Sequence, residues 1–354
     1  MATRPRYIRP LDFKAGRIDM SHGAGGRASA QLIEELFMPA FANEWLAQGH
    51  DGATFAPPPE LAQGGQLVMA TDAHVVSPIF FPGGDLGCLS VHGTINDVAM
   101  SGARPLYLSA SFIIEEGYPL SDLRRLVQSM AQASHEAGVP IITGDTKVVE
   151  QGKGDGVFIS TTGVGVTYPG LRIDGRQAQP GDVVFVSGTL GDHGVAVLSQ
   201  RESLAFETTI CSDTAALHTL VADLVAAAGP GLHVLRDPTR GGLATTLNEI
   251  AQQSGCGIHI DERALPVAPE VEAACELLGL DPLYVANEGK LIAICAPQAA
   301  ARVQEALLAH PLGRGAQRIG EVVADAQCFV QMRTRFGGTR MVDWLTGEQL
   351  PRIC

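Results

Sequence analysis

The sequence predicts two domains of mixed α/β and α+β structure. The chain has 354 residues, 45% of them hydrophobic, which is more core-forming material than one domain usually holds. Its 41 glycines and 21 prolines, against only 5% aromatic residues, are typical of many short elements joined by turns rather than of a helical bundle. It contains no apolar run of eighteen residues, so we expect no membrane span.

Strands and helices are predicted from two kinds of pattern. Apolar runs rich in β-branched residues and bounded by turn signals predict strands at 67–71, 106–114, 157–166, 183–186 and 291–295. Apolar residues at helical spacing predict helices at 29–37, 121–137, 243–253 and 299–308. Both kinds occur in both halves of the chain, as a mixed fold requires.

A domain boundary is predicted in the polar, Pro- and Gly-containing stretch 168–181, which a fresh strand follows. We therefore expect an N-terminal domain at 1–170 and a C-terminal α+β domain at 171–335. The periodicity weakens beyond Gly320, and the chain ends in the short polar segment EQLPRIC. Residues 336–354 are accordingly expected to form a mobile, solvent-accessible tail.

Charge and cysteine content exclude several classes of protein. A formal net charge of -13 without a dense Lys/Arg tract argues against nucleic-acid binding. The N-terminus has basic residues but no adjoining apolar stretch, so a secretory signal is not indicated and a cytoplasmic location is expected. The seven cysteines are scattered and form no CxxC pair, which fits neither a disulfide framework nor a zinc site.

Four acidic residues are the main candidates for chemistry. The chain has neither GxxxxGK[ST] nor a GxGxxG that opens a helix after a strand. Instead, Asp72, Asp97, Asp145 and Asp237 each lie at the edge of an apolar strand or a Gly-rich turn. Each alone is more often a turn former or helix cap. Together they favour a site for a hard metal ion that also binds phosphate oxygens, such as Mg²⁺ with ATP.

Other motifs are weaker signals. Lys147 follows Gly144, Asp145 and Thr146, which suits a cation reaching phosphate as well as a solvated charge. The SHGAGG loop with Gly25 and Gly26 suits a flap over phosphates as well as an ordinary turn. On spacing alone, the ANEGK segment predicts a turn in which Glu288 and Lys290 form a surface ion pair. His193 in GDHG reads as a helix cap, and we assign it no role.

The C-terminal residue is a cysteine on a tail with no core to fill. An exposed free thiol is an oxidation liability unless the protein uses it. The position of Cys354 therefore favours a role as carrier or nucleophile.

These motifs together resemble the HypE family of hydrogenase maturation proteins, within the superfamily of aminoimidazole ribonucleotide synthetase and selenophosphate synthetase. The resemblance runs from about SHGAGG to the final PRIC, which is nearly the whole chain. It rests on the ordered set TDAHVVSPIFFPGGDLG, GTINDVAMSGA, GDTKVV, SGTLGDHG, RDPTRGG, ANEGKL and the terminal PRIC.

The resemblance implies a fold, a reaction and partners. The expected fold is aminoimidazole ribonucleotide synthetase-like, with N-terminal strands that pair across a homodimer. The expected reaction is ATP-dependent dehydration of a carbamoyl group on Cys354, from thiocarboxamide to thiocyanate, which supplies cyanide to the iron of nickel-iron hydrogenases. The implied partners are the carbamoyltransferase HypF and the HypC-HypD iron scaffold complex. Lys147 and Glu288 would act in the dehydration, and the residues implied to hold Mg-ATP are Asp72, Asn96, Asp97, Asp145 and Asp237.

Two kinds of alternative remain open on the sequence. A selenophosphate synthetase needs a reactive cysteine or selenocysteine near the Gly-rich N-terminus, whereas the first cysteine here is Cys88. An aminoimidazole ribonucleotide synthetase has no use for a terminal PRIC. The other alternative is a non-catalytic scaffold that binds ATP only to regulate assembly, and the presence of Lys147, Glu288 and Cys354 argues against it.

Overall fold

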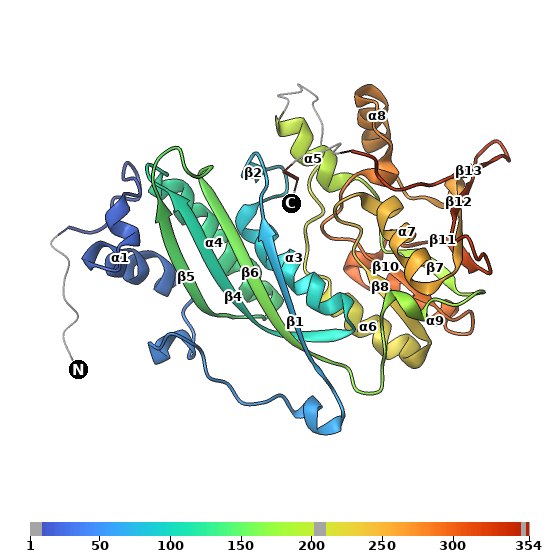
Figure 1. Ribbon diagram of the computed structural model, residues 1–354, viewed down its shortest axis with the longest axis horizontal. Coiled ribbons are helices and arrows are strands. Elements are labelled where there is room, and N and C mark those ends of the chain that lie inside the picture. Colours follow the sequence, from blue (N-terminus) through green and yellow to red (C-terminus); the bar gives the residue numbers. More distant parts are fainter. Residues whose placement is uncertain (1–8, 202–209, 348–351, 354) are drawn as a thin grey trace.

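The computed structural model describes residues 9–201, 210–347 and 352–353. Figure 1 shows two halves, each built on a sheet and covered by helices. The helices are α1 (Arg27–Leu32), α2 (Met38–Ala40), α3 (Leu86–Met100), α4 (Leu120–Ala137), α5 (Asp192–Arg201), α6 (His218–Ala228), α7 (Gly242–Ser254), α8 (Pro269–Leu278) and α9 (Ala300–Ala309). The strands are β1 (Leu67–His74), β2 (Phe80–Phe81), β3 (Gly84–Asp85), β4 (Ala103–Glu115), β5 (Ile141–Val149), β6 (Val157–Thr167), β7 (Val183–Val186), β8 (Leu232–Arg236), β9 (Gly257–Asp261), β10 (Ile292–Cys295), β11 (Gln317–Val323), β12 (Val330–Arg333) and β13 (Thr339–Met341).

The N-terminal half contains a four-stranded sheet in the order β1-β6-β4-β5. The β1/β6 and β6/β4 pairs are antiparallel and the β4/β5 pair is parallel. Helices α3 and α4 cover one face of this sheet, while the other face is open towards the viewer in Figure 1. Leu67 and Met69 are two residues apart in β1, so both side chains point to the open face, where they are 60% and 75% exposed. Two large apolar side chains exposed side by side are unusual on the surface of a protein.

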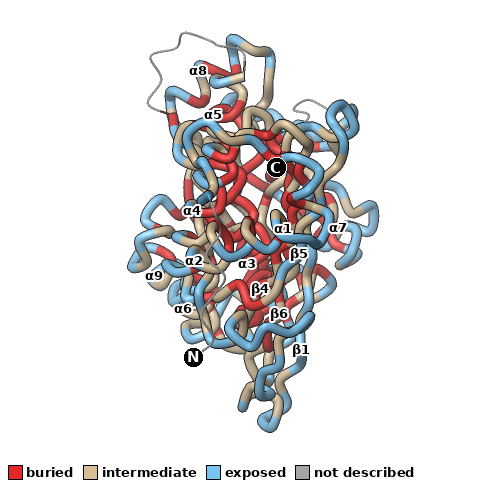
Figure 2. The backbone as a smooth tube through the Cα atoms, turned by 90° about the vertical axis from the view of Figure 1, so that its left-hand side faces the viewer, coloured by how far each residue is buried: buried red, intermediate tan, exposed pale blue. Residues whose placement is uncertain are grey.

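The C-terminal half contains a seven-stranded sheet in the order β13-β12-β9-β11-β7-β10-β8. All of its pairs are antiparallel except β12 with β9. In β10, Ile292 and Ile294 pack on the side of α7, whereas Ala293 and Cys295 pack on the side of α6 and α9. An uninterrupted apolar run is thus buried on both faces of the sheet, as such runs usually are. Figure 2 shows that buried residues, drawn in red, gather in the middle of the molecule, with exposed residues around the outside.

Helix α3 lies where the two halves meet. It contacts β1, β4 and β6 of the first sheet and also α6 and β8 of the second half. Nearly all of its residues are buried, both apolar ones such as Leu89 and Ile95 and polar ones such as Thr94. A helix that is buried on every side has no solvent-exposed polar face and so no amphipathic period, which explains why the sequence did not predict it.

The predicted mixed two-domain architecture is confirmed, and every predicted strand and helix coincides with an observed element to within a few residues. The predicted helix at 29–37 contains a change of winding, because α1 continues into a π-helical turn, Ile33–Phe37. The domain limits at 170 and 335 remain a prediction. Beyond Gly320, the weakened periodicity nevertheless corresponds to the regular strands β12 and β13.

Candidate active site

Two of the predicted acids meet between β1 and α3. Asp72 lies within β1, not at its edge as predicted, and faces α3 at Gly93. A Cβ atom at Gly93 would lie 3.7 Å from Asp72 Oδ2 and 3.0 Å from His74 Cε1, so the absent side chain makes room for both. Asp97 follows Gly93 by one helical turn, on the same face of α3. The strand and the helix thus bring Asp72 and Asp97 to one place.

The third acid, Asp237, comes from the other half of the molecule. It directly follows β8, in the turn that leads into α7. The helix begins at Gly242 with φ +59°, and a Cβ there would lie 2.6 Å from the carbonyl oxygen of Leu283. Only glycine fits this turn without strain. The RDPTRGG motif therefore fixes Asp237 at the junction of the two halves.

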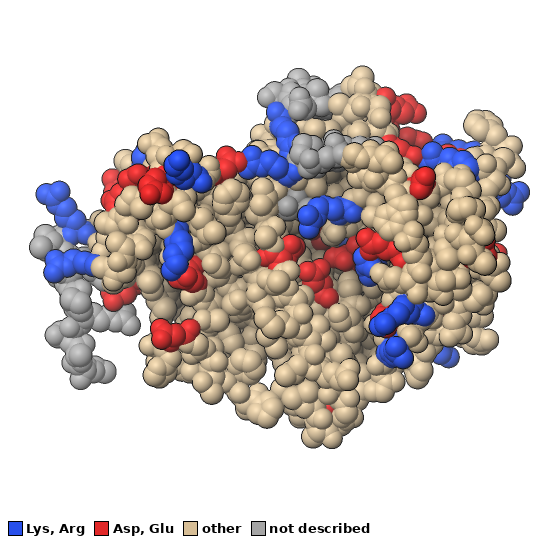
Figure 3. Space-filling model, viewed as in Figure 1, with Lys and Arg blue, Asp and Glu red and all other residues tan. Residues whose placement is uncertain are grey.

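These acids lie in one electrostatic cluster. Burial, followed by the charges of Asp237 and Asp72, raises the pKa of Asp97 to about 7. Burial also raises the pKa of Asp237 above its usual value. Burial raises the pKa of Glu288 well above its usual range, and the charges of Asp237, Asp213, Asp72 and Asp97 add to that effect. Figure 3 shows acidic side chains gathered at the centre of this face. Such a set of carboxylates attracts a cation.

Glu288 lies in a tightly fixed loop before β10. The backbone N–H groups of Glu288 and Gly289 donate to the Asp213 carboxylate at 3.1 and 3.2 Å, and Lys290 Nζ donates to it at 3.1 Å. Glu288 is only 4% exposed, and its Oε1 has no hydrogen-bond partner among the described residues. The surface ion pair that the spacing favoured is therefore wrong for Glu288. A buried, unpaired carboxyl with a raised pKa is a candidate proton acceptor.

Asn96 has a different place from the one the resemblance implied. Its Nδ2 donates to the carbonyl oxygens of Ala215 at 3.0 Å and Glu288 at 3.2 Å, and its Oδ1 accepts from Leu217 N–H at 2.8 Å. The amide is buried and bonded on both ends, so it is not free to hold a nucleotide. It ties α3 to the Glu288 loop and positions that loop.

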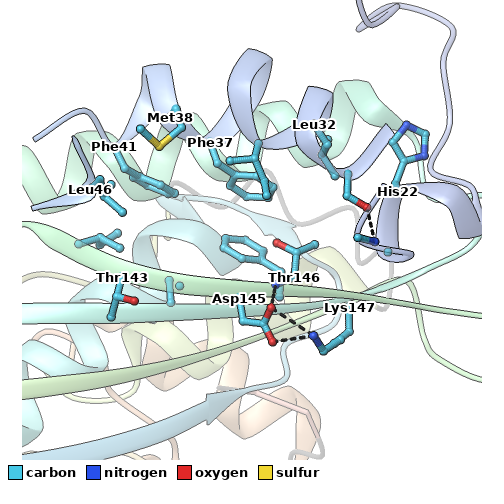
Figure 4. Close-up of a pocket in the computed structure, with 18 residues that line it drawn as sticks. His22, Leu32, Phe37, Met38, Phe41, Leu46, Thr143, Asp145, Thr146 and Lys147 are labelled. Atoms are coloured by element: carbon cyan, nitrogen blue, oxygen red, sulfur yellow. Dashed lines mark hydrogen bonds and ion pairs between the residues drawn. The ribbon is translucent and has the colours of Figure 1, made fainter. Parts of the chain in front are cut away.

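A cavity of about 270 Å³ lies on the other edge of the N-terminal sheet, between the N-terminal helical segment and β4–β5. Leu32, Phe37 and Phe41 line its upper wall in Figure 4. Phe112 of β4 also lines the cavity and packs against the Phe37 ring, with centroids 5.0 Å apart. The lining is apolar at this end and polar at the other. A flat ring with a charged substituent matches that division.

The polar end of this cavity contains the second group of predicted residues. Gly25, Gly144 and Thr146 line it together with Asp145 and Lys147, whereas Gly26 is only adjacent, as the N-cap of α1. Lys147 Nζ lies 2.9 Å from Asp145 Oδ2, as Figure 4 shows. The hydrogen bond from Lys147 lowers the pKa of Asp145, the opposite of the shift at Asp97.

Asp145 does not join the other three acids within one chain. Asp72 pairs with Thr161, Thr161 with Ala110, and Ala110 with Gly144, so three strand spacings separate Asp72 from Gly144. That is about 14 Å at roughly 4.8 Å per strand. Asp145, the next residue, points to the opposite face because side chains alternate along a strand. The prediction that all four acids surround one ion is therefore wrong for a single protomer.

The remaining three acids have the donor chemistry of a metal site. Carboxylate oxygens in a desolvated, mutually repelling group are the ligands that Mg²⁺ prefers. No three His, Cys, Asp or Glu side chains in 9–201, 210–347 and 352–353 are close enough to enclose an ion by themselves. Magnesium commonly binds through one or two carboxylates while phosphates and waters complete its shell. The cluster of Asp72, Asp97 and Asp237 fits that open kind of site.

The end of the tail is docked inward, contrary to the expectation of an exposed tail. Ile353 is 4% exposed, forms a β-bridge with Val76 and packs into the N-terminal core. Its carbonyl oxygen lies 2.7 Å from His193 Nε2. Polar composition suggested exposure, but one apolar side chain suffices to seat the end of the chain. Cys354 lies outside the described residues.

Three residues near the site escaped the sequence analysis. Asp213 fixes the Glu288 loop from a position far away in the chain. His193 was treated as a helix cap, yet it contacts the tail end. The charge of Arg240 lowers the pKa of Asp97. Arg240 and His193 carried a usable signal, since Arg240 lies in the RDPTRGG motif beside Asp237 and His193 lies in the SGTLGDHG motif.

The fold and the site place the chain among the AIR synthase related proteins. Residues 49–167 match the N-terminal domain of AIR synthase related protein, and residues 179–333 match its C-terminal domain. Carbamoyl dehydratase HypE of Cupriavidus necator is 70% identical over 348 residues, 98% of each chain. Carbamoyl dehydratase HypE of Escherichia coli is 47% identical over 337 residues, 95% of this chain and 99% of the other. The chain belongs to the HypE family of carbamoyl dehydratases, which confirms the resemblance.

Solved structures agree with this placement. The structure of hydrogenase maturation protein HypE in complex with ATP has a TM-score of 0.89 and 50% identity, covering 95% of this chain and 99% of that one. A HypE-HypF complex contains a chain with a TM-score of 0.77 and 47% identity, covering 89% and 99%. Within the described residues, no helix is both long and apolar enough to cross a membrane.

Proposed function

We propose that this protein uses ATP to dehydrate a carbamoyl group carried on Cys354, giving a thiocyanate whose cyanide becomes a ligand of hydrogenase iron. The supporting observation is that hydrogen bonds link the inward seat of the tail to the loop of Glu288. The Ile353 carbonyl oxygen is bound by His193, whose ring also bonds Ser212, and the next residue, Asp213, accepts hydrogen bonds from the Glu288 loop. The structure described for HypE with ATP supports the nucleotide requirement.

The reaction balances with one molecule of ATP for each water removed. The oxygen of the Cys354 thiocarboxamide attacks the γ-phosphate, and ADP leaves. The phosphorylated oxygen is now a good leaving group, so phosphate departs as the nitrogen loses both of its protons and the C≡N bond forms. The sulfur keeps its bond to carbon throughout. A base is needed at the nitrogen, and a cation is needed at the phosphate.

Glu288 is the proposed base. Its raised pKa means that it binds a proton more strongly than an ordinary carboxylate does. A cation held by Asp72, Asp97 and Asp237 would remove much of the repulsion acting on Glu288 and favour its charged form. Magnesium at those acids would neutralise phosphate charge when the nucleotide is bound. Glu288 would thus become an active base mainly when Mg-ATP is present.

The nucleotide is proposed to place its ring in the 270 Å³ cavity and its phosphates towards Lys147. In one protomer, Lys147 and the Asp72 cluster occupy opposite edges of the sheet. A second protomer covering the open face would bring the Lys147 of one chain to the Glu288 of the other. The exposed Leu67 and Met69 on that face support such a homodimer.

A subunit-mixing experiment tests this arrangement. Homodimers of Lys147→Ala and of Glu288→Ala are expected to accept the carbamoyl group and stop there. A purified heterodimer of the two variants has one complete site, formed by the intact Glu288 of the Lys147→Ala subunit and the intact Lys147 of its partner. We therefore expect thiocyanate on Cys354 of the Lys147→Ala subunit alone, as read by mass spectrometry. If the heterodimer is as inactive as both homodimers, the shared site is wrong.

HypF is the proposed carbamoyl donor, supported by the HypE-HypF complex described for a relative. The HypC-HypD complex is the proposed acceptor of cyanide. Delivery to either partner requires the docked tail to leave its seat and return, because the thiol must visit a second protein. Magnesium dependence, the homodimer and the HypC-HypD interaction all belong to this proposal.

A further inference from the structure

The last described carbonyl groups of the tail are bound by residues of α5 and its neighbours. The carbonyl oxygen of Arg352 accepts hydrogen bonds from Ser77 N–H at 3.0 Å and Arg201 Nη2 at 2.9 Å. The carbonyl oxygen of Ile353 is 2.7 Å from His193 Nε2. His193 and Arg201 stand at the two ends of α5, about two turns apart, so both can face the tail.

An apolar seat completes this contact. Ile353 packs in one cluster with Val76, Phe81 and Val197, of which Val197 lies on α5 between the two donors. The ring of Phe81 also meets the His193 ring edge-on, with centroids 5.4 Å apart. The seat therefore combines backbone hydrogen bonds with a pocket for one isoleucine.

The hydrogen bonds define the form of His193. A carbonyl oxygen can only accept, so Nε2 carries the proton and donates it. Ser212 Oγ is 2.8 Å from Nδ1 and donates to it, while accepting from Thr214 N–H at 3.1 Å. Complete burial lowers the pKa of His193 and keeps the ring neutral. Thus Ser212 holds the ring in the tautomer that faces the tail.

We propose that α5 is the receptor for the tail, with His193 and Arg201 as positioning residues that hold its inward state. The proposal rests on the proposed function, because it explains how Cys354 is brought to the dehydration site. It gives the GDHG motif a role that the reaction itself leaves open.

The receptor recognises groups that never change during the reaction. It contacts two backbone carbonyl groups and the Ile353 side chain, while the Arg352 guanidinium pairs with Asp155. None of these groups depends on what the thiol carries. The free, carbamoylated and cyanated forms of the tail should therefore dock with similar affinity, so that docking itself does not select the substrate.

Carboxypeptidase digestion of the full-length protein measures docking without any catalysis. Release of Cys354 requires cleavage of the bond whose carbonyl oxygen His193 binds, so the tail must first leave its seat. Intact mass gives the rate of release. Arg201→Gln and His193→Leu should each speed release about tenfold, the effect of losing one or two such hydrogen bonds. His193→Gln retains an N–H donor and should stay within about twofold of the parent protein.

Matched controls separate docking from folding and from catalysis. Gln200→Ala changes an exposed neighbour on the same helix and should leave release unchanged. Glu288→Ala should leave release unchanged while abolishing cyanation. If His193→Leu does not fold, Arg201→Gln at the end of α5 and Ile353→Ser near the chain terminus give the same measurement. The proposal is overturned if the folded Arg201→Gln and Ile353→Ser proteins release Cys354 at the parental rate.

The same variants distinguish this proposal from the proposed function. Both hold if Arg201→Gln speeds release, accepts the carbamoyl group normally and lowers the rate of cyanation. Accelerated release, together with no cyanation even in the parent protein, would leave the receptor standing and sink the function. If the Arg201→Gln protein releases Cys354 and forms thiocyanate at the parental rates, the receptor is wrong and the proposed function stands. The release rate and the cyanation rate, both altered in His193→Leu, should both return to the parental values in His193→Gln. A merely structural role of the ring would not produce this joint recovery.

Discussion

Replacing Asp97 by asparagine should stabilise the nucleotide-free protein above pH 7 while destroying its use of Mg-ATP. Asp97 has its pKa raised to about 7 from 3.8, a shift of about three units. Each unit corresponds to about 1.4 kcal/mol, so holding this group charged in the folded state costs roughly 4 kcal/mol. Partial exposure and relaxation reduce that value, and we expect a gain of about 2–3 kcal/mol in the variant.

The pH dependence of this effect follows from the direction of the shift. The folded protein binds the Asp97 proton more strongly than the unfolded chain does. The contribution of this group to the free energy of unfolding is therefore fully present below pH 4 and is lost as the pH rises towards 7. Asp237 and Glu288 have raised pKa values too and add a loss of the same sign. In the Asp97→Asn protein the free energy of unfolding should fall less steeply with rising pH, because the Asp97 carboxyl no longer contributes to the fall.

Thermal unfolding between pH 5 and 8, with and without Mg-ATP, measures this effect. The variant should melt on the order of 5 °C higher than the parent at pH 7.5 without ligand. Mg-ATP should raise the melting temperature of the parent but not of the variant. Asp223→Asn, at an exposed acid on α6, is the control and should change neither property. A variant that is less stable than the parent at pH 7.5, or that still binds Mg-ATP, would refute the reasoning.

Further predictions concern the loop of Glu288 and the transfer of the carbamoyl group. Gly289→Ala would place a Cβ 1.7 Å from the carbonyl oxygen of Asp213, so we expect a loss of several kcal/mol in unfolding experiments, whereas Gly52→Ala, with open space around it, should be nearly neutral. Asn96→Ala leaves buried backbone groups without partners and should cost about 1–3 kcal/mol and slow dehydration more than loading. Lys147→Ala should accept the carbamoyl group at the parental rate and retain it, which intact mass would show; failure to load would contradict its place in the dehydration step.

Local patterns predicted the parts of the fold that depend on neighbouring residues. The apolar runs at β7 and β10 are continuous because both faces of those strands are buried, and such runs need no knowledge of the partner strands. Helix α3 could not be predicted in this way, since it is surrounded by protein on nearly all sides and has no solvent-exposed polar face. Strand order depends on long-range pairing, so nothing in the sequence placed β1 and β5 at opposite edges.

The same distinction explains the outcome for the candidate site. Of the four acids that the motifs grouped, Asp72 and Asp237 lie near enough to raise the pKa of Asp97, whereas Asp145 faces the other side of the sheet. The docking of the tail could not be predicted from the sequence, because His193 and Ile353 lie 160 positions apart and neither has a local pattern that indicates the other. A polar ending suggested exposure, whereas burial of a single isoleucine determined the observed position.

The central claim is that the dehydrated group sits on Cys354, and peptide mass mapping tests it most directly. The protein is incubated with the carbamoyl-donating partner, carbamoyl phosphate and Mg-ATP, then digested and mapped, with Cys354→Ala as the control. We predict a carbamoyl adduct on the C-terminal peptide that loses one water in an ATP-dependent step, while the six other cysteines remain unmodified. Loss of water located on any other residue, or adducts that persist in the Cys354→Ala protein, would contradict the account.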